Sequence, residues 1–217
     1  GLRLGMAARN VFPVLCVSGK ENIGVGRLME FITFNVPSPT EALHAKTLVS
    51  GEKITFNEAA PTTLFVFKTA NETHVGNIVY MKVMSGELAE GMDVVNSTNE
   101  GKERIAQIFV NSGKTRTKIE KAAAGDIIST IKLKDVSTND TLTSTKNIGD
   151  KLNEIKFPEP IYTTAIKAVD SADDEKLGMV LNEYASNDCS LKVEIARELK
   201  QTIISAMGEY HVNTLKW

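Results

Sequence analysis

The chain has 217 residues, 42% of them apolar and 24% charged, and a net charge of −2. This composition is ordinary for a soluble globular protein with one large or two small domains, and it excludes a chain that is basic throughout. No apolar run approaches the roughly 18 residues of a membrane span, so we expect no membrane partner.

The first 36 residues have the pattern of the end of an α/β unit. Residues 11–18 form a continuous apolar run, which predicts a strand buried on both faces. Val25, Leu28, Met29 and Ile32 then follow with helical spacing, which predicts an amphipathic helix. Proline at positions 37 and 39 ends that helix and begins a linker.

Residues 61–157 have the pattern of a small closed β-structure. Residues 37–60 lack strong periodicity and are interpreted as the linker. Residues 64–67 then form a buried strand, and Val79, Met81 and Val83 alternate in the next one. Ser85-Gly86 predicts a turn into a short return strand, which makes a first hairpin. Further short strands with turn residues between them favour a sandwich or a barrel.

The remaining residues, 158–217, change pattern to strand, helix, strand, strand, helix. Pro158 and Pro160 mark the boundary, and apolar residues at helical spacing follow from Leu177 to Tyr184. Leu191 opens an alternating strand, and residues 202–207 form its partner. This order is that of a split βαβ, or ferredoxin-like, fold that lacks its last strand.

Basic residues are concentrated between Glu100 and Lys134, a segment that contains eight lysines and arginines but only four acidic residues. This local surplus fits either a modest phosphate-facing patch or a solvated rim of strands and loops. The turn expected at 111–118 carries three of the cations, Lys114, Arg116 and Lys118. It holds no aromatic residue for base stacking, so contacts there would be to phosphates.

Cysteine and histidine are sparse. Cys16 and Cys189 are too far apart in sequence to suggest a disulfide framework, which favours a reducing, cytoplasmic location. His44, His74 and His211 lack ligand spacing, so we expect no metal site. The Gly208–His211 group invites a catalytic interpretation, but Glu209 and His211 point to different faces of a helix. We therefore expect capping or interdomain contact there, and no catalytic residue.

Two sets of residues resemble a known family. The barrel region is similar to the second domain of translation-factor GTPases at Gly76, Tyr80, Val83, Ser85, Gly86, Leu88 and Gly91. The last region resembles the third domain of elongation factor G at Asp174–Leu177, Gln201–Ser205 and Met207–His211. Three positions depart from the family pattern, since Gly19 stands for alanine, Asn139 for glycine and Tyr210 for leucine.

The resemblance implies an α+β fold, mainly β, with a translation-factor β-barrel followed by a truncated ferredoxin-like domain. Residues 1–36 would be the C-terminal end of a GTP-binding domain, and Ser18, Gly19 and Lys20 its guanine loop. Gly1 is not an initiator methionine, so we expect a segment of a longer protein. No G-x-x-x-x-G-K-[ST] phosphate loop occurs, so GTP or GDP would bind the parent protein, and this chain alone should be inactive.

The resemblance also implies partners and a role. The parent would bind the ribosome and move tRNA and mRNA, and this chain would serve as a monomer in docking and interdomain relay. Lys114, Arg116 and Lys118 are then the candidate contacts to small-subunit ribosomal RNA. Three alternatives stay open: a tetracycline-resistance ribosomal protection protein, a standalone RNA-binding barrel, and a structural module that binds no nucleic acid.

Overall fold

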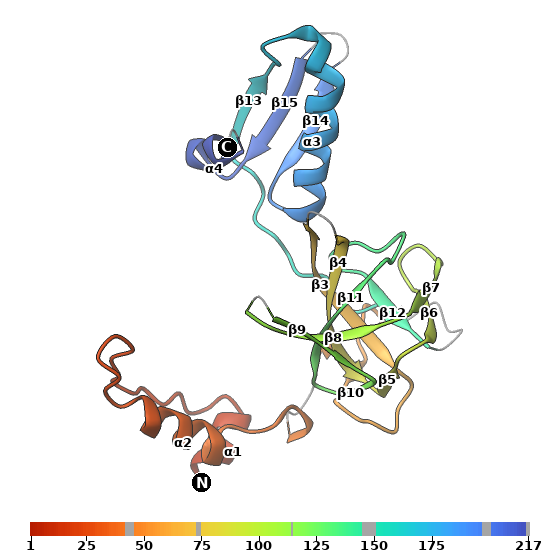
Figure 1. The fold of residues 1–217 in the computed structure, drawn as a ribbon. Coiled ribbons are helices and arrows are strands. Elements are labelled where there is room, and N and C mark those ends of the chain that lie inside the picture. Colours follow the sequence, from red (N-terminus) through yellow and green to blue (C-terminus); the bar gives the residue numbers. More distant parts are fainter. Residues whose placement is uncertain (42–45, 73–74, 114, 145–150, 197–200, 216–217) are drawn as a thin grey trace.

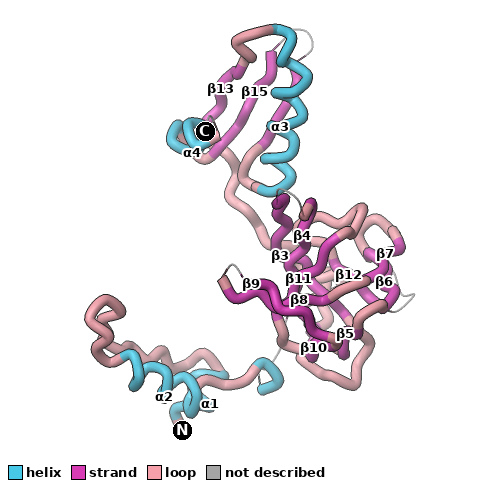
Figure 2. Tube along the Cα trace, viewed as in Figure 1, coloured by secondary structure: helices cyan, strands magenta, loops and turns pink. Residues whose placement is uncertain are grey.

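The structure is a computed structural model that describes residues 1–41, 46–72, 75–113, 115–144, 151–196 and 201–215. Figure 1 shows three parts in chain order: short helices near the N-terminus, a β-barrel, and a small unit in which a long helix lies beside a sheet. The secondary-structure colouring of Figure 2 shows that strands dominate the middle part. The predicted α+β, mainly β fold class is confirmed.

The N-terminal part contains α1 (Leu2–Ala7), α2 (Val25–Asn35) and a single 3-10 turn, η1 (Pro39–Glu41). The helix predicted from residue 25 is thus confirmed. The strand predicted over residues 11–18 is wrong, because only Ser18 forms a β-bridge, and it does so with Ile23. Val14 is 92% exposed. A two-faced strand needs neighbouring strands, and no described segment pairs with residues 11–17.

The barrel is built on an eight-stranded sheet in the order β7-β6-β12-β3-β4-β11-β8-β9. Neighbouring strands are antiparallel throughout. Its strands are β3 (Thr63–Glu72), β4 (Gly76–Ser85), β6 (Met92–Asn96), β7 (Lys102–Ile105), β8 (Ile108–Ser112), β9 (Thr115–Ile119), β11 (Ile127–Ile131) and β12 (Thr141–Thr143). Two short pairs accompany it: β1 (Lys46–Thr47) with β2 (Lys53–Ile54), and β5 (Glu87–Ala89) with β10 (Lys121–Ala123).

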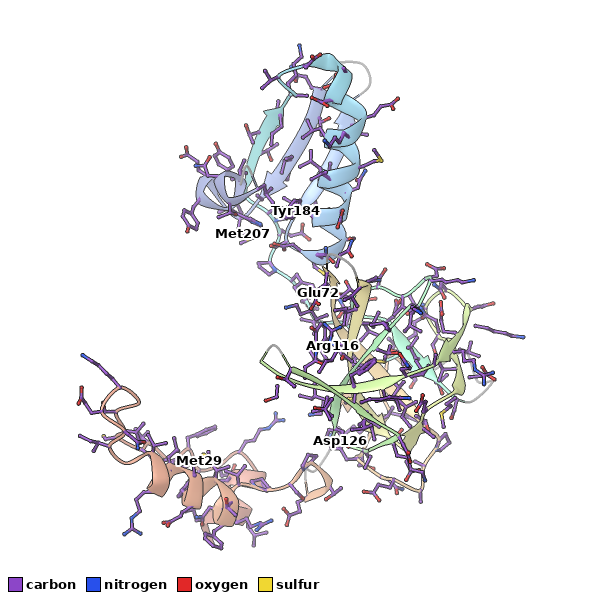
Figure 3. All side chains as sticks on the ribbon, in the orientation of Figure 1. Met29, Glu72, Arg116, Asp126, Tyr184 and Met207 are labelled. Atoms are coloured by element: carbon purple, nitrogen blue, oxygen red, sulfur yellow. The ribbon has the colours of Figure 1, made fainter. Side chains whose placement is uncertain are left out.

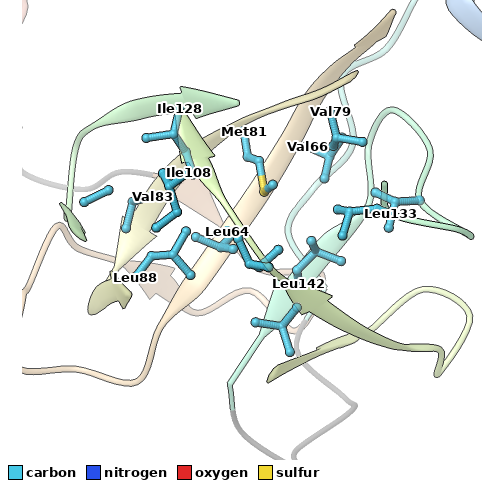
Figure 4. Close-up of a cluster of buried hydrophobic side chains, with 14 residues drawn as sticks. Leu64, Val66, Val79, Met81, Val83, Leu88, Ile108, Ile128, Leu133 and Leu142 are labelled. Atoms are coloured by element: carbon cyan, nitrogen blue, oxygen red, sulfur yellow. The ribbon is translucent and has the colours of Figure 1, made fainter. Parts of the chain in front are cut away.

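Inward-pointing apolar side chains alternate with outward-pointing ones along β3 and β4, and the inward-pointing ones form the core of the barrel. Val79, Met81 and Val83 all point inward and are fully buried, as predicted from their spacing. Leu64 from β3 and Leu142 from β12 meet them in one cluster of buried side chains (Figure 4). Inward-facing residues from many strands therefore share one hydrophobic core.

A second cluster covers part of the outer face of the barrel. Leu48 and Leu152, which come from segments on either side of the barrel strands, pack with Phe65 and Met84 and are at most 5% exposed. Leu48 and Leu152 also form an isolated β-bridge. Part of the segment 37–60 that we interpret as a linker is thus packed on the barrel.

The pairing of the predicted first hairpin differs from the expectation. The turn at Ser85 and Gly86 and the return strand β5 are present, but β5 pairs with β10, and the partners of β4 are β3 and β11. Gly86 has a φ of 74° and donates its N–H to the carbonyl oxygen of Asn57 at 2.7 Å. This bond turns the chain away from β4, so the two strands do not form a ladder.

The terminal unit follows the predicted order. It contains β13 (Tyr162–Ile166), the 3-10 turn η2 (Ser171–Asp173), α3 (Asp174–Asn187), β14 (Lys192–Ala196), β15 (Gln201–Ala206) and α4 (Glu209–Thr214). The sheet order is β13-β15-β14, with antiparallel pairs. Leu181 of α3 and Val212 of α4 pack with Leu191 and Ile204, which gives this unit a core of its own.

Candidate nucleic-acid interface

The predicted basic turn is a strand hairpin in the structure. Arg116 and Lys118 lie on β9, which pairs with β8 through Asn111 and Arg116 and through Phe109 and Lys118. The turn predicted over 111–118 is thus too long, and only residues 113 and 114 separate the two strands. Lys114 lies outside the described residues. Threonine alternates with basic residues in β9 without an apolar pattern, so its periodicity does not indicate a strand.

Both described cations of this site hold an acidic partner. The guanidinium of Arg116 lies 2.7 Å from a carboxylate oxygen of Glu72, and Nζ of Lys118 lies 2.7 Å from Glu90. Figure 3 shows Arg116 and Glu72 where β9 approaches the end of β3. Both pairs are at least partly exposed to solvent, and ion pairs at a protein surface contribute about 0–1 kcal/mol. Phosphate can therefore replace the carboxylates at low cost, although the local positive surplus is partly neutralised.

Aromatic residues lie on the same outer face, brought there by strand register. Tyr80 of β4 pairs with Ser129 of β11, which pairs in turn with Phe109 of β8. Lys68 of β3 pairs with Tyr80, and its Nζ lies 5.9 Å from the centre of the Tyr80 ring. The sequence did not connect these aromatics with the basic residues, because Tyr80 is far from residues 111–118 in the chain and Phe109 lies just outside that range. Their outward position in alternating strands is the signal that could have found them.

The junction between the barrel and the terminal unit is polar. Thr69 donates a hydrogen bond of 3.2 Å from Oγ1 to the backbone oxygen of Ser186, at the end of α3. Asn71 donates from its side-chain amide to the Glu183 carboxylate. The backbone N–H of Thr69 is held by Thr138 at 3.2 Å. The last turn of α3 is therefore tied to the outer end of β3.

Asn139 connects the barrel to the segment that leads into the terminal unit. Its side chain donates to the Ile155 carbonyl at 3.1 Å and accepts from the Ile155 N–H at 2.8 Å. Its φ of 80° is in the left-handed region, which asparagine tolerates better than most residues. Glycine would tolerate this backbone too, but it would make neither side-chain bond.

We predict that Asn139→Gly will loosen this segment without disturbing the barrel. The substitution keeps the backbone conformation and removes both hydrogen bonds, each of which contributes about 0.5–1.5 kcal/mol. Exchange of the Ile155 amide hydrogen should become about tenfold faster or more. Amide exchange in β4 serves as the control and should not change. Unchanged protection at Ile155 would contradict the prediction.

The Gly208–His211 group forms a contact within the terminal unit. Nε2 of His211 lies 3.1 Å from a carboxylate oxygen of Asp188, and Nδ1 accepts from the Met207 N–H at 3.3 Å. Tyr210 is 84% exposed. Partial burial by itself would raise the pKa of Asp188, but hydrogen bonds from Ser190 and the charge of His211 outweigh it, so this pKa is below its ordinary value.

The lowered pKa of Asp188 predicts a loss of stability in acid. A carboxyl whose pKa is depressed on folding stabilises the fold above its unfolded pKa of about 3.9, and the contribution disappears as the pH falls through the folded pKa. Because the side chain is 43% exposed, the loss should not exceed about 1 kcal/mol. Urea unfolding of the terminal unit, followed by the NMR signals of β15 from pH 6 to about pH 3, measures this loss of stability. An equal acid loss in Asp188→Asn would contradict this assignment.

Two family models match the chain. One describes domain 2 of elongation factor G and matches residues 61–145, and the other describes domain III of elongation factor G and matches residues 157–217. Together they cover more than half of the sequence. The chain belongs to the elongation factor G family. It therefore carries domains of a translation elongation factor.

A solved structure agrees with this family assignment in its fold. A crystal structure of a protein from Thermus thermophilus superposes with a TM-score of 0.80 at 25% sequence identity. The match covers 99% of the present chain and 30% of the Thermus protein. The present chain thus spans less than a third of the length of that relative.

The predicted guanine loop of this elongation factor G chain is a tight turn. Ser18 and Ile23 exchange backbone hydrogen bonds of 2.9 and 3.0 Å, and the Ser18 hydroxyl accepts from the Glu21 N–H at 3.2 Å. Among the described backbone bonds, the N–H groups of Gly19 and Lys20 donate to no carbonyl. The role of these two N–H groups in recognising a guanine base stays a prediction.

The described residues contain neither a metal-binding cluster of side chains nor a membrane-spanning helix. No group of three or more histidine, cysteine, aspartate or glutamate side chains in that part of the chain is arranged to hold a metal ion. Within the same ranges, no helix is both long enough and apolar enough to cross a bilayer.

Proposed function

We propose that this chain serves ribosomal translocation, as the part of an elongation factor G that docks on the small subunit and relays the state of the nucleotide domain. Its family membership is the observation that carries the proposal. The parent would bind GTP or GDP in the cytoplasm, with Ser18, Gly19 and Lys20 contributing to guanine recognition, and would move tRNA and mRNA. The isolated chain would act as a monomer without hydrolysing GTP.

Docking is assigned to the outer face of the barrel around β9. Arg116 and Lys118 lie on this edge strand, and both side chains remain partly exposed beside their carboxylate partners, so they can contact phosphates of ribosomal RNA. Lys114 is included in this proposal on the basis of the sequence, because it lies outside the described residues. Relay is assigned to the junction, where Thr69 and Asn71 hold the end of α3 and so couple the orientation of the terminal unit to the barrel.

Co-sedimentation with small ribosomal subunits tests the docking. The chain should pellet with the subunits and be released as salt rises, because phosphate contacts displace counterions. Arg116→Glu combined with Lys118→Glu should weaken binding at least about tenfold, since two contacts are lost. Arg104→Glu is the matched control, because Arg104 is another paired and exposed cation of the barrel, on the opposite edge strand β7.

The result also separates the alternatives. If full-length elongation factor G displaces the bound chain from the subunits, the result supports the proposed function. Binding to unrelated single-stranded RNA with equal affinity would instead indicate a standalone RNA-binding barrel. Failure to pellet at subunit concentrations in the micromolar range would reject docking by this part of the protein.

A further inference from the structure

A small pocket opens on the outer face of the barrel, near the ends of the β3–β4 and β8–β9 hairpins. Its volume is about 220 Å³, and it is lined by Glu72, Tyr80, Asn111, Gly113, Thr115 and Arg116. Pockets for drug-sized ligands are larger, roughly 300–1,000 Å³. This one suits a single flat ring system that enters from an exposed surface.

The polar groups of the pocket are held in place before any ligand arrives. Arg116 is fixed by Glu72 at 2.7 Å. The Ser129 hydroxyl donates to Oδ1 of Asn111 at 3.0 Å, and Ser129 is only 2% exposed. This bond orients the Asn111 amide and leaves its Nδ2 group to donate elsewhere. Glu72 retains acceptor sites after binding Arg116, because a carboxylate has about four lone-pair positions.

Tyr80 supplies an aromatic wall that is itself supported from the side of β3. Phe67 lies 6.5 Å away between ring centroids at an interplanar angle of 44°, and Lys68 lies near the ring on the same side of β4. Asn111 and Arg116 come from β8 and β9, on the other side of β4 in the sheet. An aromatic ring beside fixed donors and acceptors is the arrangement by which proteins bind unpaired bases of RNA.

We propose that this pocket binds one unpaired RNA base whose exocyclic amino group lies beside an acceptor ring nitrogen on the Watson–Crick edge, which means adenine or cytosine. The base would stack on Tyr80, its amino group would donate to Glu72, and Nδ2 of Asn111 would donate to a ring nitrogen or carbonyl. Lys68 and Lys118 flank the site and provide positive charge for the adjoining phosphates. The proposal rests on the proposed docking of this face to RNA and adds a base-reading subsite to it.

Binding of a short fluorescein-labelled uridine oligomer with one central adenosine tests the pocket. The same oligomer with a central purine riboside, which lacks the amino group, and the all-uridine oligomer are the comparison ligands. Anisotropy titrations up to about 1 mM protein cover the weak range expected for one base. We expect the adenosine oligomer to bind about tenfold more tightly than the purine riboside oligomer, since the latter lacks the hydrogen bond from the amino group to a charged acceptor.

Three variants identify the residues. Tyr80→Leu should weaken binding of the adenosine oligomer about tenfold, and Tyr80→Phe should retain it, because stacking needs only the ring. Glu72→Gln should reduce the preference for adenosine over purine riboside to about twofold or less, because the amide lacks the charge that strengthens this bond. Tyr162→Leu, on the terminal unit, is the matched control and should bind like the unaltered chain.

The outcomes separate this proposal from the docking that underlies it. Equal binding of the three oligomers, or unchanged binding by Tyr80→Leu, overturns the base pocket. If the chain still pellets with small subunits through Arg116 and Lys118 in that case, docking stands and only the base subsite is wrong. If the chain fails to pellet yet discriminates adenosine through Tyr80, the pocket stands and ribosomal docking is wrong.

Discussion

Replacing Gly86 with alanine should destabilise the barrel by roughly 2–5 kcal/mol. A Cβ at this position would lie 2.6 Å from both the backbone N and the Cα of Thr62, and 2.7 Å from the Ala60 carbonyl oxygen. These are backbone atoms, so no rotation of a side chain relieves the overlap. The φ of 74° adds the strain of a left-handed backbone. Urea unfolding monitored at β4 measures the loss.

Gly76→Ala is the matched control for this experiment. Gly76 begins β4, its φ is 83°, and a Cβ there would meet no atom of the described residues within 4 Å. Only the backbone strain remains, which should cost about 1–2 kcal/mol. If Gly76→Ala proves as damaging as Gly86→Ala, close packing at the Gly86 corner is not the cause.

Leu64→Ala should destabilise the barrel by a comparable amount, because it removes a side chain from the hydrophobic core. Leu64 is fully buried in the cluster that joins β3, β4 and β12, which also contains Val83 and Leu142. Deleting the side chain removes apolar burial and leaves a cavity, a combination that costs about 2–5 kcal/mol. The unfolding midpoint of the barrel in urea should fall accordingly, with its slope unchanged.

Leu4→Ala provides the comparison for the core substitution. Leu4 lies on α1 and is 73% exposed, so the same chemical change removes little buried surface. Its effect on the barrel should stay within about 0.5 kcal/mol. A loss of less than about 1 kcal/mol in Leu64→Ala would mean that the barrel core repacks around the missing side chain.

The local sequence pattern was sufficient to predict a helix or a strand wherever a short segment has a clear periodicity of apolar residues. The alternation of Val79, Met81 and Val83 predicted β4, and helical spacing predicted α2 and α3. The order of elements in the terminal unit followed in the same way. These features depend on which face of a single strand or helix is apolar, and the sequence states this directly.

Partners of a strand are decided by contacts between distant residues. β5 follows β4 in the chain but pairs with β10, because the Gly86 corner redirects it. Residues 11–18 have the composition of a buried strand, yet the described chain offers them no neighbouring strand. A sheet is stabilised by pairs of residues on neighbouring strands, and these residues can be far apart in the sequence. A local sequence pattern therefore does not show which strands will pair.

The sequence by itself determined the family, the fold class, the order of the elements and the identity of the basic residues Arg116 and Lys118. Only the tertiary structure decided that those cations are paired with Glu72 and Glu90, and that Tyr80 lies in the pocket beside Arg116. The physical reason is that strand register places residues from different strands about 5 Å apart, whatever their distance along the chain.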